Sequence, residues 1–272
     1  MRNQTIPDMP ILDETFLLYT ACVFYTAALI IAYLDRRRFT YAYLIVACIL
    51  GLASHTSSLA ERWDRIGHGP FINLHEILSS NLWSLMLGLT CFILLARRQR
   101  EAMRFIFPVP GLLMIWLLLT PPRDTHLPAT YDTLWLYFHV LSGKFFLALL
   151  MLATGLAIYE YLRLAGDKGP GTGAAVDSTS YRLLAFAFCF ESLMLLFGAV
   201  WAQDAWGRYW AWDPLETWAF LTWICVIFVL HWRLNHPRRA VYAILVSACF
   251  VLAFLTFFGV PFVSTAPHKG MI

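Results

Sequence analysis

The chain has 272 residues, of which 60% are hydrophobic and only 14% are charged, and its formal net charge at pH 7 is +3. Soluble domains are usually about 45–50% apolar and about 25% charged, so this composition argues against a water-soluble protein with one core. The small net charge gives no indication of a nucleic-acid partner. The composition instead indicates a polytopic membrane protein.

Apolar runs of near-membrane length follow one another along the chain. Because about 20 apolar residues span a hydrocarbon layer of about 30 Å, each run predicts a transmembrane helix. We therefore predict an all-α polytopic integral membrane protein with about eight transmembrane helices, forming a single membrane domain over residues 1–272. In chain order, the predicted spans are 14–34, 41–60, 74–96, 104–120, 133–162, 180–201, 215–235 and 239–260.

The connections between these segments carry the basic charge that orients a membrane protein. Arginine-rich connections are found in every second position: DRRR (35–38), RRQREAMR (97–104), the loop from Arg163 to Arg182, and RLNHPRR (233–239). Basic loops stay in the cytoplasm, so both termini and the loops around 61–73, 121–132 and 202–214 are predicted to face outward. We expect His68 and His126, in two of these outer loops, to be solvated.

The last of these outer loops belongs to a tryptophan-rich strip, WAQDAWGRYWAWDPLETWAF, which runs from Trp201 to Phe220. Its flanking segments are already long enough to span, so we predict a short amphipathic piece at the membrane interface. Dense rings with a few polar groups suit a flat, apolar ligand of porphyrin size, which stacks on the rings while Arg208 reaches a carboxylate. The alternative is an ordinary aromatic belt.

Two acids of the strip allow two interpretations. Asp213 and Glu216 can serve as an acid–base pair, or they can hydrogen-bond the backbone or a histidine and so orient the tryptophans. Pro214 followed by Glu216 is also typical of a helix start.

The segment WGRYWAWDPLETWAFLTW (206–223) closely resembles the WWD signature of the haem-handling proteins of cytochrome c maturation, and within that group the CcsA/ResC branch of System II. The resemblance extends to HTSSLAERWDRIGHGPFINLHEILSSNLW (55–83), to FHVLSGKFF from Phe138, and to LHWRLNH (230–236). His75 stands where a tyrosine is usual, and FGVPFVSTAPHKG (258–270) departs from the usual asparagine-containing form.

The resemblance implies that haem b, iron protoporphyrin IX, binds on a platform built from the strip. It implies that His139 and His268 are the two outer haem ligands. A rise of about 1.5 Å per residue places both near the outer face. The platform residues are expected to be Trp206, Gly207, Arg208, Tyr209, Trp210, Trp212, Asp213, Pro214 and Glu216.

Two further histidines lie within spans at different depths. His231 lies about 24 Å below the outer end of its helix, near the cytoplasmic leaflet, and the resemblance makes it a transmembrane haem ligand. His55 lies about 20 Å above the inner end of its own helix, in the outer half. The two are therefore not expected to share an iron, and His55 is either haem-related or a buried hydrogen-bonded histidine. The second ligand for His231 is expected to come from another chain.

The function implied by the resemblance is haem delivery across the membrane and covalent attachment to the CxxCH segment of apocytochrome c on the outer side. The chain would be part of a holocytochrome c synthase, or haem lyase, complex with a CcsB/ResB-type partner, served indirectly by thiol-reducing proteins. It would lie in a bacterial inner or plasma membrane or in a thylakoid membrane. Two alternatives stay open: a b-type electron-transfer subunit, and a haem-binding assembly subunit of the same family without catalytic activity.

Overall fold

The computed structural model describes residues 14–34, 38–164, 178–236 and 238–260, and these residues are almost entirely helical, with no strand among them. They form two compact units, an N-terminal unit that ends at Gly67 and a C-terminal unit that begins at His68. The all-α prediction is confirmed. The expectation of a single membrane domain stays a prediction.

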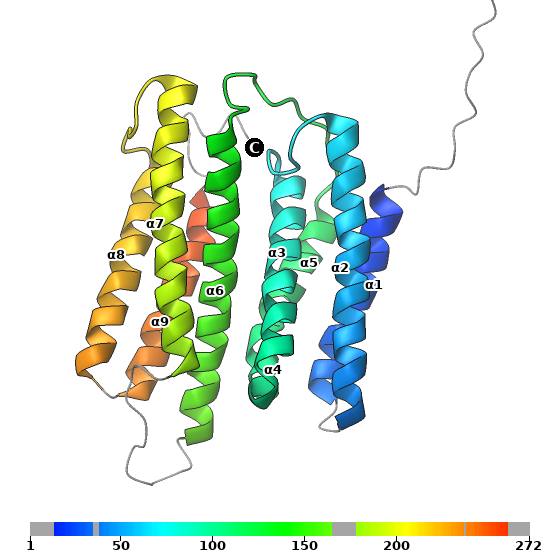
Figure 1. Ribbon diagram of the computed structural model, residues 1–272, viewed down its shortest axis with the longest axis vertical. Coiled ribbons are helices and arrows are strands. Elements are labelled where there is room, and N and C mark those ends of the chain that lie inside the picture. The colour runs from blue at the N-terminus through cyan, green and yellow to red at the C-terminus, as the bar shows by residue number, and fades with distance from the viewer. Residues whose placement is uncertain (1–13, 35–37, 165–177, 237, 261–272) are drawn as a thin grey trace, which may run out of the picture. The chain divides into compact units, whose positions relative to one another are not determined.

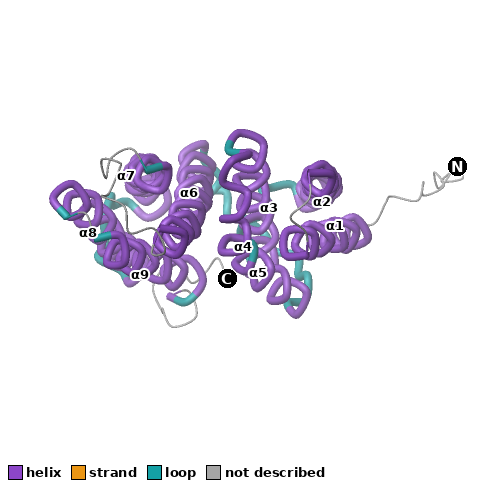
Figure 2. The backbone as a smooth tube through the Cα atoms, turned by 90° about the horizontal axis from the view of Figure 1, so that it is seen from below, coloured by secondary structure: helices purple, strands orange, loops and turns teal. Residues whose placement is uncertain are grey.

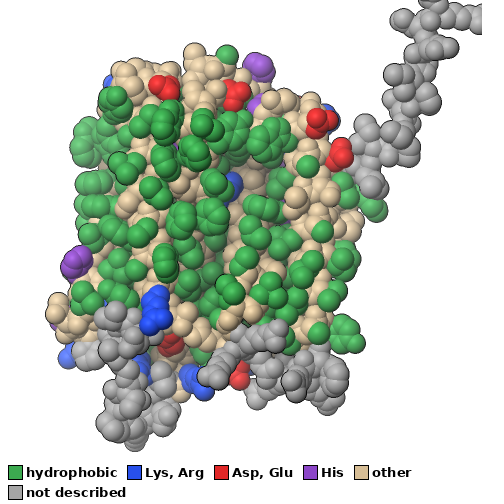
Figure 3. Space-filling view, in the orientation of Figure 1, with side chains coloured by type: hydrophobic (Ala, Val, Ile, Leu, Met, Phe, Trp, Pro, Cys, Tyr) green, Lys and Arg blue, Asp and Glu red, His purple; other side chains and the backbone are tan. Residues whose placement is uncertain are grey.

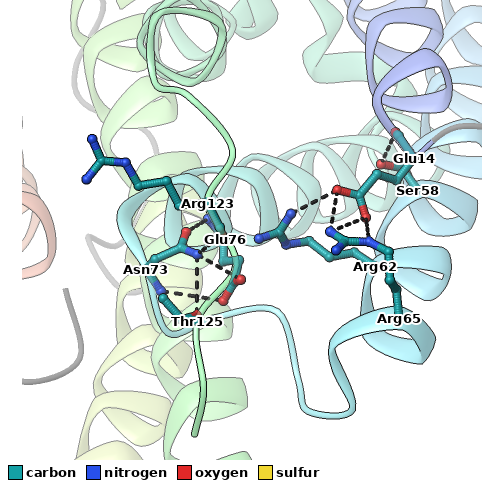
Figure 4. Close-up of polar contacts among 8 residues, drawn as sticks. All are labelled: Glu14, Ser58, Arg62, Arg65, Asn73, Glu76, Arg123 and Thr125. Atoms are coloured by element: carbon teal, nitrogen blue, oxygen red, sulfur yellow. Dashed lines mark hydrogen bonds and ion pairs between the residues drawn. The ribbon is translucent and has the colours of Figure 1, made fainter.

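The N-terminal unit is a helical hairpin of α1 (Glu14–Leu34) and α2 (Arg38–Ile66). The Glu14 carboxylate, in the first turn of α1, accepts hydrogen bonds from Arg62 at 2.9 Å and from Arg65 at 2.9 Å. Ser58 donates to the Glu14 carbonyl at 2.7 Å, as Figure 4 shows. Because Arg62 is buried, these contacts fasten the start of α1 to the last turns of α2.

The C-terminal unit is built around a long helix, α6 (Leu134–Leu164), which packs against α3 (Leu74–Leu95), α7 (Thr179–Trp206) and α9 (Arg239–Phe258) (Figures 1 and 2). Helix α8 (Pro214–Asn235) packs on α7 and α9. Large side chains of α6, among them Phe146 and Leu150, are fully buried at this centre.

Among the described residues, seven helices are long and apolar enough to span a membrane, whereas about eight spans were predicted. The predicted span 104–120 is instead a short apolar stretch divided into α4 (Met103–Ile106) and α5 (Pro108–Leu119), preceded by the 3-10 helix η1 (Arg97–Ala102). Pro108 explains the division, because proline has no N–H to continue a helix and favours the first position of a new one.

The divided segment nevertheless covers the length of α3. It starts after the C-terminal end of α3, and the chain that follows it reaches the N-terminal end of α3 (Figure 1). There the Asn73 side chain donates to the Arg123 carbonyl at 2.6 Å, and Asn73 and Glu76 form a capping box (Figure 4). His68 also bonds the Thr125 carbonyl there, at 2.9 Å, and is buried. The expectation that His68 is solvated is therefore wrong, because this connection folds back over it.

The surface of the C-terminal unit has a broad hydrophobic band. In Figure 3 hydrophobic side chains cover the middle of its helices, and most of the visible Lys and Arg side chains lie at the lower end, where α6 ends and α9 begins. This distribution is that of a membrane protein with one arginine-rich end. The tryptophan-rich strip lies at the opposite end (Figure 1).

Candidate ligand-binding cavity

A cavity of about 220 Å³ lies within the C-terminal unit at the end that holds the strip. It is lined by residues of α3, α6, α7, α8 and α9 and by the connection between α7 and α8. Its walls are mostly apolar and aromatic, with a few polar groups, which is the usual composition of a site for a small molecule or a cofactor. The site is therefore formed by helices distant in sequence.

The connection between α7 and α8 is shorter than the loop 202–214 that we predicted. Helix α7 continues to Trp206, and Gly207 ends it in a left-handed conformation, with φ at 77°. Glycine adopts this conformation without strain, which is why helices often end this way. Helix α8 begins at Pro214, so only seven residues, Gly207 to Asp213, lie outside the two helices.

The two acids of the strip hold the backbone at the start of α8. Asp213 is the N-cap and accepts from the Glu216 N–H at 2.9 Å. Glu216 in turn accepts from the Ala211 N–H at 2.7 Å and from the Asp213 N–H at 3.4 Å. This is a capping box, so the predicted helix start at Pro214 is confirmed. Between these hydrogen bonds Trp212 is held in a left-handed conformation, with φ at 57°.

The aromatic side chains of the strip divide between the core and the cavity. Trp206 packs at 4.9 Å, edge to face, on the buried Trp201. Tyr209 and Trp210 line the cavity. Trp212 is 67% exposed and packs on Trp210 at 5.7 Å. Arg208 is exposed and is not among the residues that line the cavity.

His139, the predicted outer ligand on α6, lies in the wall of this cavity. Its Nδ1 is 2.8 Å from the carbonyl oxygen of Met194 on α7, and its ring lies nearly parallel to that of Trp201, at 6.2 Å. A carbonyl can only accept, so Nδ1 carries the proton and Nε2 carries the lone pair. This tautomer, fixed by a backbone carbonyl, is the usual one of a histidine that binds a metal.

Glycines make room beside this histidine. A Cβ at Gly198 of α7 would lie 2.7 Å from Nδ1 of His139, and a Cβ at Gly143 of α6 would lie 2.9 Å from the sulfur of Met194. Any larger residue at Gly198 therefore has to displace the imidazole. The absence of these two side chains sets how closely α6 and α7 approach at the cavity.

Two buried polar atoms in the cavity wall have no hydrogen-bond partner among the described residues. They are the Trp210 indole nitrogen, a donor, and the Asn81 side-chain oxygen, an acceptor. Buried polar groups of proteins are nearly always bonded, and leaving one unsatisfied costs about 1–3 kcal/mol. One donor and one acceptor are thus available to a polar ligand.

The other predicted histidines lie away from this cavity or outside the described residues. His231 is exposed on α8, and its Nδ1 is 2.9 Å from the Ile227 carbonyl of the same helix. His55 is buried in the N-terminal unit, with Nδ1 3.3 Å from the Tyr25 hydroxyl. His268 lies outside the described residues, and the expected pair of outer ligands stays a prediction.

Several residues of the cavity were not predicted from the sequence. Trp201 opens the quoted strip, and Lys144 stands within FHVLSGKFF, but neither was singled out. The signal for Lys144 was available, since a lysine inside a predicted span is uncommon and usually functional. Asn81, Met194 and Gly198 gave no comparable signal, because their roles depend on contacts between helices.

A family model described as Cytochrome C assembly protein matches residues 13–268 of the chain. The chain belongs to the cytochrome c assembly protein family. The predicted resemblance is thereby confirmed, and the cavity, the strip and His139 all lie within the matched residues of this assembly protein.

Relatives of this assembly protein carry the name cytochrome c biogenesis protein CcsA. The one from Chlamydomonas reinhardtii is 30% identical over 226 residues, which cover 78% of this chain and 63% of that protein. The ones from Prochlorococcus marinus and Guillardia theta are each 27% identical, over 86% and 84% of both chains. The chain thus spans somewhat less than two thirds of the Chlamydomonas protein and most of the other two.

The fold of the assembly protein also matches a solved structure named Cytochrome c Heme Lyase CcmF, with a TM-score of 0.71 and 14% sequence identity. The match covers 95% of this chain and 48% of the CcmF chain, so this chain spans about half the length of that protein. At such low identity the likeness concerns the fold alone.

Proposed function

We propose that this chain binds haem b in the cavity between α6 and α7 and, with a CcsB/ResB-type partner, presents it to apocytochrome c for covalent attachment. The observation that carries the proposal is the hydrogen bond from His139 Nδ1 to the Met194 carbonyl, at 2.8 Å. It leaves Nε2 as the nitrogen that can ligate iron.

The residues of the cavity suit haem in several ways. The walls are largely apolar and aromatic, as a macrocycle requires, and Trp201 lies against the His139 ring. Gly143 and Gly198 leave space that any side chain would fill. The unpartnered Trp210 N–H supplies a donor for a polar atom of the ligand. His268 remains the proposed second outer ligand, as the family resemblance implies.

During attachment the chain holds the haem, orients it and shields it from water, and none of its residues acts as a nucleophile. His139 would hold the iron, and Tyr209 and Trp210 form part of the cavity wall. Each thiol of a CxxCH segment adds its sulfur to one carbon and its hydrogen to the other carbon of a vinyl C=C bond. The addition needs reduced thiols and involves no net oxidation. Asp213 and Glu216 are assigned to positioning the strip, since their oxygens already accept backbone N–H groups.

The proposal also assigns the two ends of the C-terminal unit to the two sides of the membrane. Arginine-rich connections mark the cytoplasmic end, so the cavity and the strip face the periplasm or the thylakoid lumen. His231 lies 17 residues after Pro214 in α8, about 26 Å along the helix, near the cytoplasmic end. We propose that it ligates haem on its way to the cavity, with a second ligand from the partner chain.

The test is co-expression of the chain with its CcsB/ResB-type partner and an apocytochrome c, followed by purification and absorption spectroscopy. We expect a Soret band from non-covalent haem in the purified complex. We also expect covalently bound haem in the cytochrome, detected by haem staining after denaturing electrophoresis. A complex with no Soret band, even after haem is added, would contradict the proposal. Haem in the complex without thioether formation would favour the assembly-subunit alternative.

A further inference from the structure

Among the described residues that line the cavity, Lys144 of α6 is the only Lys or Arg. It follows His139 by five residues in the same helix. Its ammonium donates to the Ser80 hydroxyl of α3 at 2.7 Å. The Ser80 proton is already used, because the hydroxyl donates to the Glu76 carbonyl at 2.7 Å. Lys144 is therefore held on the α3 side of the cavity, and Ser80 occupies one of its three N–H donors.

No carboxylate forms an ion pair with Lys144 in the part of the chain that the structure describes. The other charged residue among the described lining residues is Glu216, whose carboxylate accepts the backbone N–H groups that start α8. A desolvated charge without a partner is costly, so charged residues within membrane proteins are usually paired or functional. Lys144 therefore has no counter-charge among the described residues, and a negatively charged ligand can supply one.

The position of Lys144 along α6 argues against a lysine that simply extends to the membrane surface. It lies 10 residues after the start of α6 and 20 before its end, so about 15 Å and 30 Å along the axis from the two ends. Lysines that extend to the interface lie near helix ends. Lys144 instead lines the cavity and also a second cavity of about 270 Å³ between α3 and α6, whose other lining residues are largely apolar.

Low polarity around the ammonium strengthens its attraction for an anion. The cavity also contains the unpartnered oxygen of Asn81, which is 4% exposed and follows Ser80 in α3. Asn81 accepts from a donor and Lys144 donates to an acceptor, so the α3 side of the cavity suits a carboxyl group in either protonation state. The exposed Arg208, which the sequence suggested for this role, does not line the cavity.

We propose that Lys144 binds a carboxylate of the porphyrin and so fixes which edge of the macrocycle faces α3. This assignment rests on the proposed function and deepens it. Protoporphyrin IX carries its two carboxylates on one edge and its vinyl groups on the other. A carboxylate held at Lys144 keeps the vinyl edge away from α3, so Lys144 selects which edge of the porphyrin is presented for attachment.

The test is an equilibrium binding titration that separates carboxylate recognition from iron ligation. Wild-type protein in detergent is titrated with iron(III) protoporphyrin IX and with its dimethyl ester, and the same pair of metal-free porphyrins is followed by fluorescence. We expect the wild type to bind both free acids at least about tenfold more tightly than the esters. Because the metal-free pair has no iron, its preference cannot come from His139.

Three variants test which residue causes the preference for the free acids over the esters. Lys144→Met keeps the length of the side chain and should abolish the preference while leaving binding of the iron ester unchanged, which also verifies that the variant is folded. Lys144→Arg and Arg208→Gln should both retain the preference.

Three results would overturn the assignment. They are equal binding of acids and esters by the wild type, a preference that survives in Lys144→Met, and loss of the preference in Arg208→Gln. In each of these cases, a Soret band that depends on His139 would leave the proposed function intact. If the wild type binds neither iron porphyrin, both proposals fail.

Discussion

His139 and His231 both direct Nδ1 to a backbone carbonyl, but the two carbonyls belong to different parts of the structure. The acceptor for His139 is Met194, 55 residues away on another helix. The acceptor for His231 is Ile227, four residues earlier on its own helix. A bond between helices fixes the ring in the wall of a cavity, whereas a bond within one helix leaves the ring on the exposed surface.

This difference predicts that the site proposed at His139 is largely built within the chain, whereas the site proposed at His231 is not. His139 has a cavity, a stacked tryptophan and neighbouring glycines, all within the C-terminal unit. His231 is exposed on α8. We therefore expect changes around His139 to affect porphyrin binding by the isolated chain, and changes at His231 to act only when a partner covers it.

The largest effect is expected for His139→Ala. Removal of the proposed iron ligand should weaken binding of iron protoporphyrin IX by about 100-fold, since even loss of an outer-shell contact to a metal ligand costs about 10–100-fold. Absorption titration of the purified chain measures it. Exogenous imidazole should restore the Soret band, because it fills the vacated position. His126→Ala is the matched control, since His126 is exposed and does not line the cavity. Equal binding by the His139 variant and the wild type would remove the contrast with His231.

Much of this contrast could be predicted from the sequence, because it depends on helix periodicity and depth. His139 was placed near the outer end and His231 near the inner end from a rise of about 1.5 Å per residue. The start of α8 could also be predicted, because a capping box is a local pattern within four residues.

What could not be predicted depends on contacts between helices. Nothing in the spacing indicates that the Met194 carbonyl accepts from His139, or that Gly198 lies against its ring. The shorter connection between α7 and α8 and the division of the predicted span 104–120 have local reasons. Gly207 and Asp213 leave only seven residues between α7 and α8, and Pro108 divides the short apolar segment.

The second prediction concerns the glycine that makes room for His139. Gly198→Ala places a methyl group 2.7 Å from Nδ1, so the ring has to move and its hydrogen bond to Met194 lengthens or breaks. We expect about tenfold weaker binding of iron protoporphyrin IX and a shifted Soret maximum, in line with the cost of changing a partner of a metal ligand. Gly88→Ala is the control, because its methyl group meets only Ala148, at 3.1 Å. An unshifted spectrum in Gly198→Ala would show that the ring does not depend on this contact.

The third prediction uses the unpartnered indole of the cavity. Trp210→Phe keeps an aromatic ring but removes the N–H, which has no partner among the described residues. Binding of iron protoporphyrin IX should weaken by about threefold, since one hydrogen bond contributes about 0.5–1.5 kcal/mol. The thermal unfolding midpoint of the ligand-free protein should stay the same or rise, because a buried unsatisfied donor is removed. Trp232→Phe, beside His236 on α8, is the control and should leave binding unchanged. A fall in the unfolding midpoint with unchanged binding would assign Trp210 to the fold rather than to the ligand.

The smallest effect on the isolated chain is expected for His231→Ala. His231 is exposed and bonds only its own helix in the described residues, so its loss should change stability by no more than about 0.5 kcal/mol and leave porphyrin binding in the cavity unchanged. Purified with a CcsB/ResB-type partner, the same variant should lose the inner haem while the His139-dependent spectrum remains. Haem content and iron-ligation spectra of the complex measure the loss of the inner haem and the persistence of the His139-dependent spectrum.

His55→Ala is the companion variant, because the positions of His55 and His231 along their helices place them at different membrane depths. It removes a buried side chain that contacts Tyr25, so it should destabilise the N-terminal unit but leave the inner haem in place. If both variants lose the same haem, the two histidines share one iron, and the prediction that they lie at different membrane depths is wrong. If His231→Ala loses a haem even without the partner, the site on α8 is complete within this chain. In that case, whether a histidine bonds a carbonyl of another helix or of its own helix would not predict which histidine forms a haem site without a partner chain.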